Sequence, residues 1–362
     1  MTGQVVLHLL PAEDGDCLLV EAKSDGDEVA IILIDGGRGR TYSNWKPYLD
    51  KVLGPRRTID LLVVTHIDED HIDGVLKFLG DEARDIAVSE VWFNGHLQVS
   101  RSLSKQELEA YSVSQADDLS EALSKSRIPW NSQFGGGPIH REALNGGTVA
   151  IGPFTLSLLT PSRRKLSALA GVWPAVLQEL KADNSDDDPE GLEGFGVGLD
   201  IDELAASPDS NDTSRPNGSS IGFLLEAFGR KLLLVGDCHP NDLWDGLIQI
   251  GAKVTAPLSV DIMKVSHHGA AKNTTRKLLS LVRAEAYGFS TDGSAHPHPD
   301  ATVVAKIIKS SASPKLLAFN YRTDLSKVWD DPELKECRKF ETRFPDEDAP
   351  GYLKLVLPPR ET

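Results

Sequence analysis

Short apolar runs alternate along the chain with stretches whose apolar residues recur at helical spacing. Apolar, β-branched runs bounded by Gly, Pro, Asp or Asn predict buried strands. We expect strands at residues 5–10, 17–22, 29–34, 59–64, 89–94, 146–152, 154–159, 221–226, 231–235, 261–265, 285–290, 315–319 and 352–357. We expect helices at residues 42–53, 72–79, 239–250 and 301–309. Strands that alternate with helices indicate the α/β fold class.

Length and composition indicate a single globular unit. The 362 residues are 40% hydrophobic and 25% charged, which is ordinary for a globular protein. We expect one domain over residues 1–362 and no membrane span, because no apolar run reaches the roughly 18 residues that a spanning helix needs. The N-terminus lacks the basic segment that opens a signal peptide, and the 3 cysteines are far apart. These features favour the reducing cytoplasm.

Charge is distributed unevenly along the chain. The net charge of −16 argues against binding of nucleic acid by the whole surface. Residues 182–212 contain eleven acids and no base. Because residues 181–216 are also rich in Gly and Ser and lack periodicity, we expect them to form a mobile insertion outside the core. Residues 38–57 hold six bases and one acid, and they are a candidate basic approach for an anionic substrate.

The strongest chemical signal lies between the strand expected at residues 59–64 and the helix expected at residues 72–79. This loop carries two imidazoles and three carboxylates: His66, Asp68, Glu69, Asp70 and His71. Imidazole and carboxylate donors at these spacings can converge on one or two divalent ions. Carboxylates grouped beside an apolar core are costly unless a cation compensates them. The alternative is an acidic turn that caps the following helix, but a cap needs one acid and no histidine.

Three later segments carry similar residue types just after an expected strand. Asp237 follows a Gly at the end of one apolar run, and the pair His267 and His268 follows another. His296 stands in a Gly-Ser-Ala-His-Pro segment after a third. Since loops at neighbouring strand ends can meet, we expect these residues to approach the histidine- and aspartate-rich loop.

Taken in order, these motifs resemble the metallo-β-lactamase superfamily, and the resemblance covers residues 4–300. The loop departs from the commonest pattern, His-x-His-x-Asp-His, because Asp68 stands at the second histidine position. This variant resembles the soluble hydrolase domain of bacterial competence (DNA-uptake) proteins and the phosphorylcholine esterases. The resemblance implies a four-layer αβ/βα sandwich with the metals at the edge where the strand-end loops converge.

The resemblance also implies a dinuclear site in which Asp237 is shared between the ions. The expected ligands are His66, Asp68 and Asp237 for one ion, and Asp70, His71, Asp237 and His267 for the other. Which of the two adjacent histidines ligates is left open. The set above takes His267, and His268 would then face the substrate or lie behind the ligands.

Further roles follow from the same resemblance. Asp16 and Asp35 would lie behind the ligands and hold the second ring nitrogen of ligating histidines. His296 matches the histidine of a Gly-His-Pro motif, with alanine in place of the glycine, and would donate a proton or hydrogen bond to the substrate. His96 and His140 are left open as additional ligands.

We therefore expect a metal-dependent hydrolase that uses a metal-activated water, with Asp70, His268 and His296 close to the chemistry. The expected cofactors are two divalent ions, Zn²⁺ or Mn²⁺. The resemblance implies a phosphodiester substrate, either a nucleotide or a nucleic acid such as single-stranded DNA. A β-lactam or thioester hydrolase of the same fold is the alternative enzyme. From a different class, the alternative is a metal-binding interaction module without catalysis.

Overall fold

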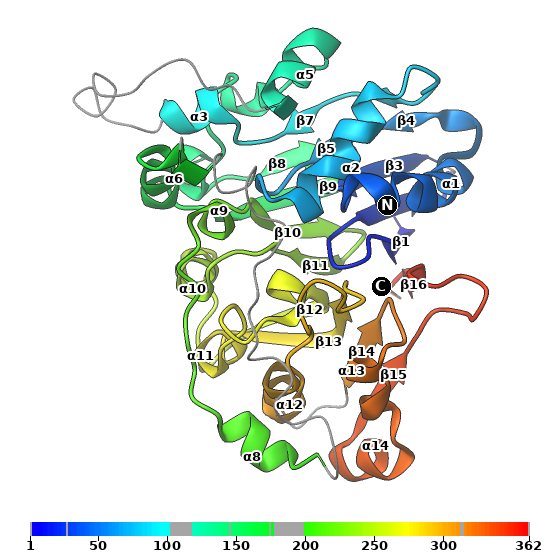
Figure 1. The fold of residues 1–362 in the computed structure, drawn as a ribbon, viewed down its shortest axis with the longest axis vertical. Coiled ribbons are helices and arrows are strands. Elements are labelled where there is room, and N and C mark those ends of the chain that lie inside the picture. Colours follow the sequence, from blue (N-terminus) through cyan, green and yellow to red (C-terminus); the bar gives the residue numbers. More distant parts are fainter. Residues whose placement is uncertain are drawn as a thin grey trace.

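Two large β-sheets form the body of the protein (Figure 1). The computed structural model describes residues 2–26, 28–101, 118–144, 146–173, 175–176, 199–311 and 315–360. Strands and helices both contribute many elements to these ranges, so the expected α/β class is confirmed.

The first sheet pairs the N-terminal strand β1 with the C-terminal strand β16. Its order is β16 (Leu353–Leu357), β1 (Gly3–Leu9), β2 (Leu18–Ser24), β3 (Val29–Ile34), β5 (Leu61–Val63) and β7 (Val91–Trp92). The pairs from β16 to β3 are antiparallel, whereas β3, β5 and β7 run parallel. The central strand β3 is an unbroken apolar run that is buried over almost its whole length, as expected for a strand covered on both faces.

The second sheet contains most of the C-terminal strands. Its order is β15 (Phe340–Arg343), β14 (Lys315–Phe319), β13 (Val282–Phe289), β12 (Leu258–Lys264), β11 (Arg230–Leu234), β10 (Gly222–Ala227), β9 (Phe154–Thr160) and β8 (Val149–Ile151). Strands β11 to β15 are parallel to one another, and the pairs from β8 to β11 are antiparallel. A short parallel pair, β4 (Thr58–Ile59) and β6 (Ala87–Val88), stands apart from both sheets.

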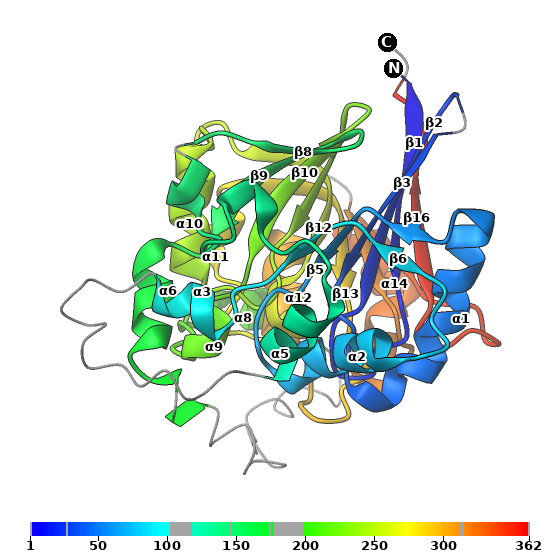
Figure 2. The ribbon, with the colours of Figure 1, turned by 90° about the horizontal axis from the view of Figure 1, so that it is seen from above.

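Helices cover the outer faces of the two sheets, which face each other across a shared apolar core (Figure 2). The helices that pack on the first sheet are α1 (Tyr42–Leu53), α2 (Glu69–Gly80), α3 (His96–Ser100), α5 (Asp118–Ser126) and α6 (Arg163–Ala170). Those that pack on the second sheet are α8 (Ile201–Ala206), α10 (Pro240–Gln249), α11 (Arg276–Leu279), α12 (Ala301–Lys309) and α14 (Pro332–Arg338). Two further short helices are α9 (Arg215–Gly218) and α13 (Asp324–Lys327).

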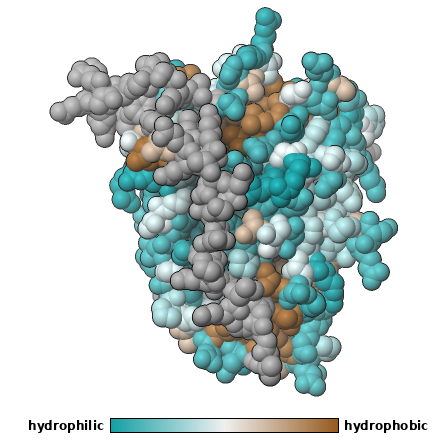
Figure 3. Space-filling view, in the orientation of Figure 1, coloured by the Kyte–Doolittle hydropathy of each residue, from teal (hydrophilic) through white to brown (hydrophobic). Residues whose placement is uncertain are grey.

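The surface agrees with this arrangement. Most of the face in Figure 3 is hydrophilic, and hydrophobic side chains gather there only in separate patches. None of the helices in the described ranges has the length and apolar character needed to cross a bilayer.

The strand expected at residues 59–64 is divided in the structure. Asp60 interrupts it, because its carboxylate accepts the backbone N–H of Ile31 at 2.7 Å, and the strand continues as β4 and β5. The strand expected at residues 89–94 is similarly reduced to β7. At its end, the side-chain amide of Asn94 donates to the backbone carbonyl of Ile139 and accepts the backbone N–H of the same residue.

The acidic insertion expected at residues 181–216 needs a correction in its second part. Residues 181–198 lie outside the described ranges, so mobility there stays a prediction. Residues 199–216 belong to the packed body, because α8 buries Ile201 and Ala205 in the core that covers the second sheet. The apolar residues of α8 recur at helical spacing between the acids, and this short pattern outweighs the acidic composition.

We predict that Ile201→Ala lowers the free energy of unfolding by about 2–4 kcal/mol, the usual cost of truncating a buried isoleucine. Urea unfolding monitored by circular dichroism measures the change. Glu203→Ala, on the exposed side of the same helix, is the control and should stay within about 0.5 kcal/mol of the parent. Equal effects of both substitutions would mean that α8 is not part of the core.

Candidate metal centre

Loops that follow strands of both sheets meet at one edge of the molecule. Neighbouring parallel strands end at the same edge, and β3 runs parallel to β5 just as β11 runs parallel to β12 and β13. The residues carried by these loops include Asp35, His66, Asp68, Asp70, His71, Asp237, His267 and His268. The topology therefore brings together side chains from segments that are far apart in the sequence.

Asp35 organises the first half of this site from behind. Its carboxylate accepts the backbone N–H of Thr65 at 2.7 Å, the Thr65 hydroxyl at 2.8 Å and the Nδ1–H of His71 at 2.9 Å. Because the Thr65 hydroxyl donates to Asp35, its oxygen is left to accept the Nδ1–H of His66 at 3.0 Å. One buried carboxylate thus orients two imidazoles, His71 directly and His66 through a hydroxyl.

Helix α2 is seated close to this carboxylate. A Cβ on Gly74 would lie 1.8 Å from the carbonyl oxygen of Gly36, so only glycine permits the approach. The helix begins at Glu69, and His71 lies in its first turn with its side chain buried against the loop. The close contact fixes the position of His71 relative to Asp35.

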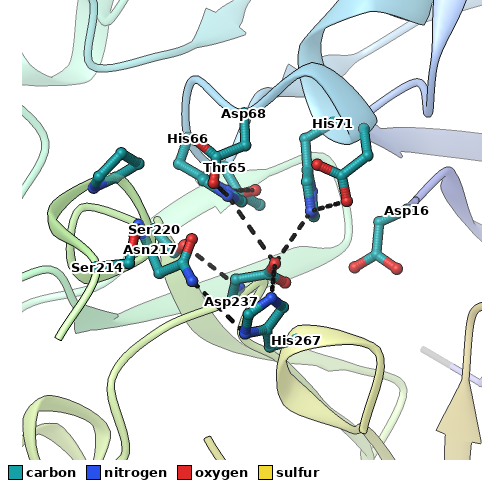
Figure 4. A network of polar contacts seen from close by, with 12 residues as sticks. Asp16, Thr65, His66, Asp68, His71, Ser214, Asn217, Ser220, Asp237 and His267 are labelled. Carbon is teal, nitrogen blue, oxygen red and sulfur yellow. Dashed lines mark hydrogen bonds and ion pairs between the residues drawn. The ribbon is translucent and has the colours of Figure 1, made fainter. Parts of the chain in front are cut away.

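Asp237 stands at the middle of the imidazoles (Figure 4). It follows β11 through Gly236, whose φ of 52° is readily adopted only by glycine and whose Cα faces Thr65. Its backbone N–H donates to the Ser220 hydroxyl at 3.3 Å, and its side chain is 2% exposed. The carboxylate therefore lies almost fully inside the protein.

His267 and His268 reach the site from a strained turn. Both have left-handed backbones, with φ of 49° and 54°, a conformation that costs a non-glycine residue about 1–2 kcal/mol. The turn directs two successive side chains toward Asp237. The Nδ1–H of His268 donates to the Ser290 carbonyl at 2.8 Å, and the Nδ1–H of His267 donates to the Asn273 side-chain oxygen at 2.9 Å.

In each of these four rings, the hydrogen bond at Nδ1 turns Nε2 toward Asp237. The distance from Nε2 to Asp237 Oδ2 is 3.9 Å for His66, 3.3 Å for His71, 3.7 Å for His267 and 3.5 Å for His268. Within the described residues, the Nε2 atoms of His66, His71 and His268 are buried and have no hydrogen-bond partner. Buried nitrogens without a partner are costly, and bound divalent cations would satisfy them.

The pKa shifts show how strongly the charges interact. Burial alone would lower the pKa of His71, but Asp237, Asp70 and Asp35 outweigh burial and raise it well above its usual value. Burial opposes the charged form of Asp237 as well, yet the surrounding imidazoles hold its pKa well below the usual range. The carboxylates of this site thus require positive charge nearby, which protons or metal ions can supply.

The donors form one tight group and one looser group that share Asp237. In the tight group, formed by Asp70, His71, Asp237 and His268, one ligand atom from each residue lies within 4.8 Å of the others. The looser group contains His66, whose Nε2 is 3.2 Å from Asp68 Oδ2, together with His267 on the open side of Asp237. Nitrogen and carboxylate donors in this mixture suit Zn²⁺ or Mn²⁺, so the residues of the tight group fit a divalent metal ion.

Of the two adjacent histidines, the tight group contains His268, whereas the expected ligand set took His267. His268, and not His267, stands with Asp70, since its Nε2 is 3.1 Å from Asp70 Oδ2. The side chain of His268 is 4% exposed and that of His267 is 26% exposed, so His267 lies nearer the substrate side. The left-handed turn, which the sequence spacing does not reveal, determines which of the two rings points toward Asp70.

His296 lies farther from the centre than His298, which the sequence did not indicate. The centroid of the His298 ring is 5.8 Å from that of His267 and 5.8 Å from that of His296, so the three rings form a row from His267 through His298 to His296. Burial, with the neighbouring imidazoles adding to it, lowers the pKa of His298 well below the usual value.

His96 and His140 are not brought into either group. His96 is buried against Trp173, with ring centroids 5.7 Å apart. His140 pairs with Glu142 at 3.0 Å. Neither ring contacts a residue of the candidate centre among the interactions that the structure shows.

The basic segment at residues 38–57 offers little free positive charge. Most of its bases are neutralised by acids of the same region: Arg38 by Asp14 and Glu69, Arg40 by Glu13, Lys46 by Asp50, Arg56 by Asp60, and Arg57 by Asp50 and Asp85. The expectation of a basic approach from this segment is therefore not supported.

Several supporting residues have no recognisable sequence motif. Asn273 holds His267 and donates to Asp212 at 2.9 Å, so Asp212 supports the site from the acidic stretch. Asp16 is 3.4 Å from the Nδ1 of His268 and pairs at 2.6 Å with Lys264, which is fully buried. Only Asp16, in its Gly-Asp turn, carried a signal in the sequence.

Comparisons with known proteins add little to this geometry. No protein-family model matches the chain, and no curated protein matches it. Among solved structures, the metallo-β-lactamase MIM-1 from Novosphingobium pentaromativorans is 14% identical with a TM-score of 0.29, over 84% of this chain and 89% of that one. A long-form RNase Z from yeast is 9% identical with a TM-score of 0.34, over 87% of this chain but only 37% of its own length. The flavodiiron protein from Giardia intestinalis is 10% identical with a TM-score of 0.25, over 93% of this chain and 86% of that one. Likenesses this weak carry no argument about activity, so the function must be argued from the residues.

We predict that the protein binds divalent metal and that His268→Ala lowers the metal content by about one ion per chain, because it removes a donor from the tight group. Elemental analysis after reconstitution and dialysis measures the content. The control is His140→Ala, which should retain the parent's metal content. If His268→Ala retained it while His267→Ala lost an ion, His267 and not His268 would belong to the tight group.

Proposed function

We propose that the protein is a metal-dependent hydrolase of the metallo-β-lactamase superfamily, with the four-layer αβ/βα sandwich of that family. The observation that carries the proposal is the convergence of four oriented imidazole Nε2 atoms on the buried carboxylate of Asp237. Such an array is difficult to explain as a structural device, since it leaves three buried nitrogens without partners in the described residues. We propose that it holds two ions.

The proposed ligands follow the two groups described above. One ion would be held by Asp70, His71, Asp237 and His268, and the other by His66, Asp68, Asp237 and His267. When bound, such ions supply an activated water near neutral pH and stabilise developing negative charge. Asp35 and Asp16 would keep the rings aligned, because a ring fixed at Nδ1 presents Nε2 in one direction.

For the substrate we propose a phosphodiester, in a nucleotide or a nucleic acid. The row formed by His267, His298 and His296 supports this choice, because it provides nitrogen donors along one path leading out of the centre. A phosphodiester has non-bridging oxygens to be bound and a leaving oxygen to be protonated. We assign His298 to hydrogen bonding of the substrate and His296, at the outer end, to the leaving oxygen.

A substrate panel tests the reaction class. We expect hydrolysis of bis(p-nitrophenyl) phosphate, with cyclic nucleotides and single-stranded DNA as further candidates. We expect no hydrolysis of nitrocefin, a β-lactam. Activity should disappear with EDTA and return with Mn²⁺ or Zn²⁺, each tested separately. Hydrolysis of nitrocefin alone would favour the β-lactam alternative, and two bound ions without turnover on any substrate would favour a non-catalytic module.

The role of His296 can be tested separately from metal binding. We expect His296→Ala to keep its metals and to lower kcat about 10²–10⁴-fold on a diester with a poor leaving group, as for loss of a positioned acid. The loss should be much smaller with p-nitrophenolate, which needs no proton to leave. Steady-state kinetics on both substrates measure the contrast, with His140→Ala as the control. An equal loss on both substrates would contradict proton donation, and a loss of metal would make His296 a ligand.

A further inference from the structure

Helix α6 opens with three cations that form no salt bridge with the described residues. Arg163, Arg164 and Lys165 begin the helix, and no carboxylate lies within salt-bridge distance of their side chains in the described part of the chain. Arg215 of the adjacent helix α9 is similar, since its guanidinium donates to the Ala168 carbonyl at 2.7 Å. This contrasts with the basic segment at residues 38–57, whose charges are largely neutralised. We call these four residues the α6–α9 basic cluster.

The cluster lies beside the candidate metal centre. The Nζ of Lys165 bonds Nδ1 of His239, which stands two residues after Asp237. On its other side, Nε2 of His239 is 3.9 Å from Asp212, and Asp212 is 3.8 Å from Nδ1 of His267. Figure 1 shows α6 and α9 next to each other.

Lys165 has hydrogen-bonding capacity to spare. The Nε2–H of His239 donates to the Ser214 carbonyl at 2.6 Å, so its Nδ1 is an acceptor and takes one of the three ammonium protons of Lys165. Burial lowers the pKa of Lys165, Asp242 opposes that effect, and Arg164 adds to it. A bound anion would offset both the cost of burying the Lys165 ammonium group and its repulsion from Arg164.

The anion would contact side chains and not the end of the helix. The N–H of Ser162 already donates to Asp242 at 2.8 Å, and that of Arg163 donates to Glu142 at 2.9 Å. Asp242 is paired in addition with Arg141 at 2.8 Å, so its charge is shared between Arg141 and Lys165. The positive charge of the cluster thus stays available.

We propose that the α6–α9 basic cluster binds the backbone phosphates of a single-stranded nucleic acid, next to the phosphodiester that enters the metal centre. This inference rests on the proposed function, because it places the cluster along the path of that substrate. Cations that contact phosphates position a strand without reading its sequence. The cluster would therefore distinguish a strand with several phosphates from a small diester that has only the scissile one.

The test is direct binding without turnover. The full chain, kept in EDTA, is titrated against a fluorescein-labelled oligothymidylate, and anisotropy is followed at several salt concentrations. Replacing Arg163, Arg164 and Lys165 by Gln should weaken binding at least tenfold. It should also reduce the slope of log K against log salt by about 2, the value for three lost phosphate contacts on a single strand.

A matched variant separates the effect of where the positive charges lie from the effect of the protein's net charge. Gln at positions 46, 56 and 57 removes the same three charges from the paired segment, and binding should stay within about twofold of the parent. Equal weakening by both triple variants, or by neither, would overturn the proposal. Hydrolysis of bis(p-nitrophenyl) phosphate is measured in parallel. If the parent hydrolyses this diester and the cluster variant binds the oligothymidylate normally, the cluster proposal fails alone. If the parent does not hydrolyse the diester with any metal, the proposed function fails.

Discussion

The structure depends on compensation of the negative charge of one buried carboxylate, that of Asp237. Asp237 is almost fully enclosed, and an isolated charge at such a depth is costly. The four imidazoles around it meet that need only if each is held in a single orientation. Their Nδ1 partners, a carboxylate, a hydroxyl, an amide and a backbone carbonyl, come from different segments of the chain. Compensation at the centre therefore constrains loops from both sheets.

Protons and metal ions compete for the same nitrogen atoms. The carboxylates raise the pKa of His71 and of His268 well above the usual value against the effect of burial, so these rings hold protons strongly when no cation is present. Binding of metal must then release protons, and affinity for metal falls as the pH falls. Lys264 pairs with Asp16 at 2.6 Å, so that carboxylate has a basic partner other than the metal.

The sequence was most informative where the chemistry is contiguous. The loop from His66 to His71 could be read directly, because four candidate ligands lie within six consecutive residues that follow a strand. The order of His267 and His268 could not be read, since a left-handed turn decides which ring points inward. Asp212 was concealed by composition: an acid in an acidic stretch carries no individual signal, although its hydrogen bonds support the site. The charges at residues 38–57 were misjudged in part because partners such as Asp14, Glu69 and Asp85 lie outside the segment and are brought close by folding.

The pairing of the first and last strands has a consequence for how the chain folds. β1 is flanked by β2, a near neighbour in sequence, and by β16, which pairs Val5 with Leu357. Closing so large a loop is entropically expensive, so this contact forms late in folding. Until it forms, one edge of β1 exposes unpaired N–H and C=O groups beside an apolar core, and such an edge can recruit a strand from another molecule. During synthesis, β1 therefore cannot complete its pairing before β16 has emerged, and its free edge stays open to aggregation until then.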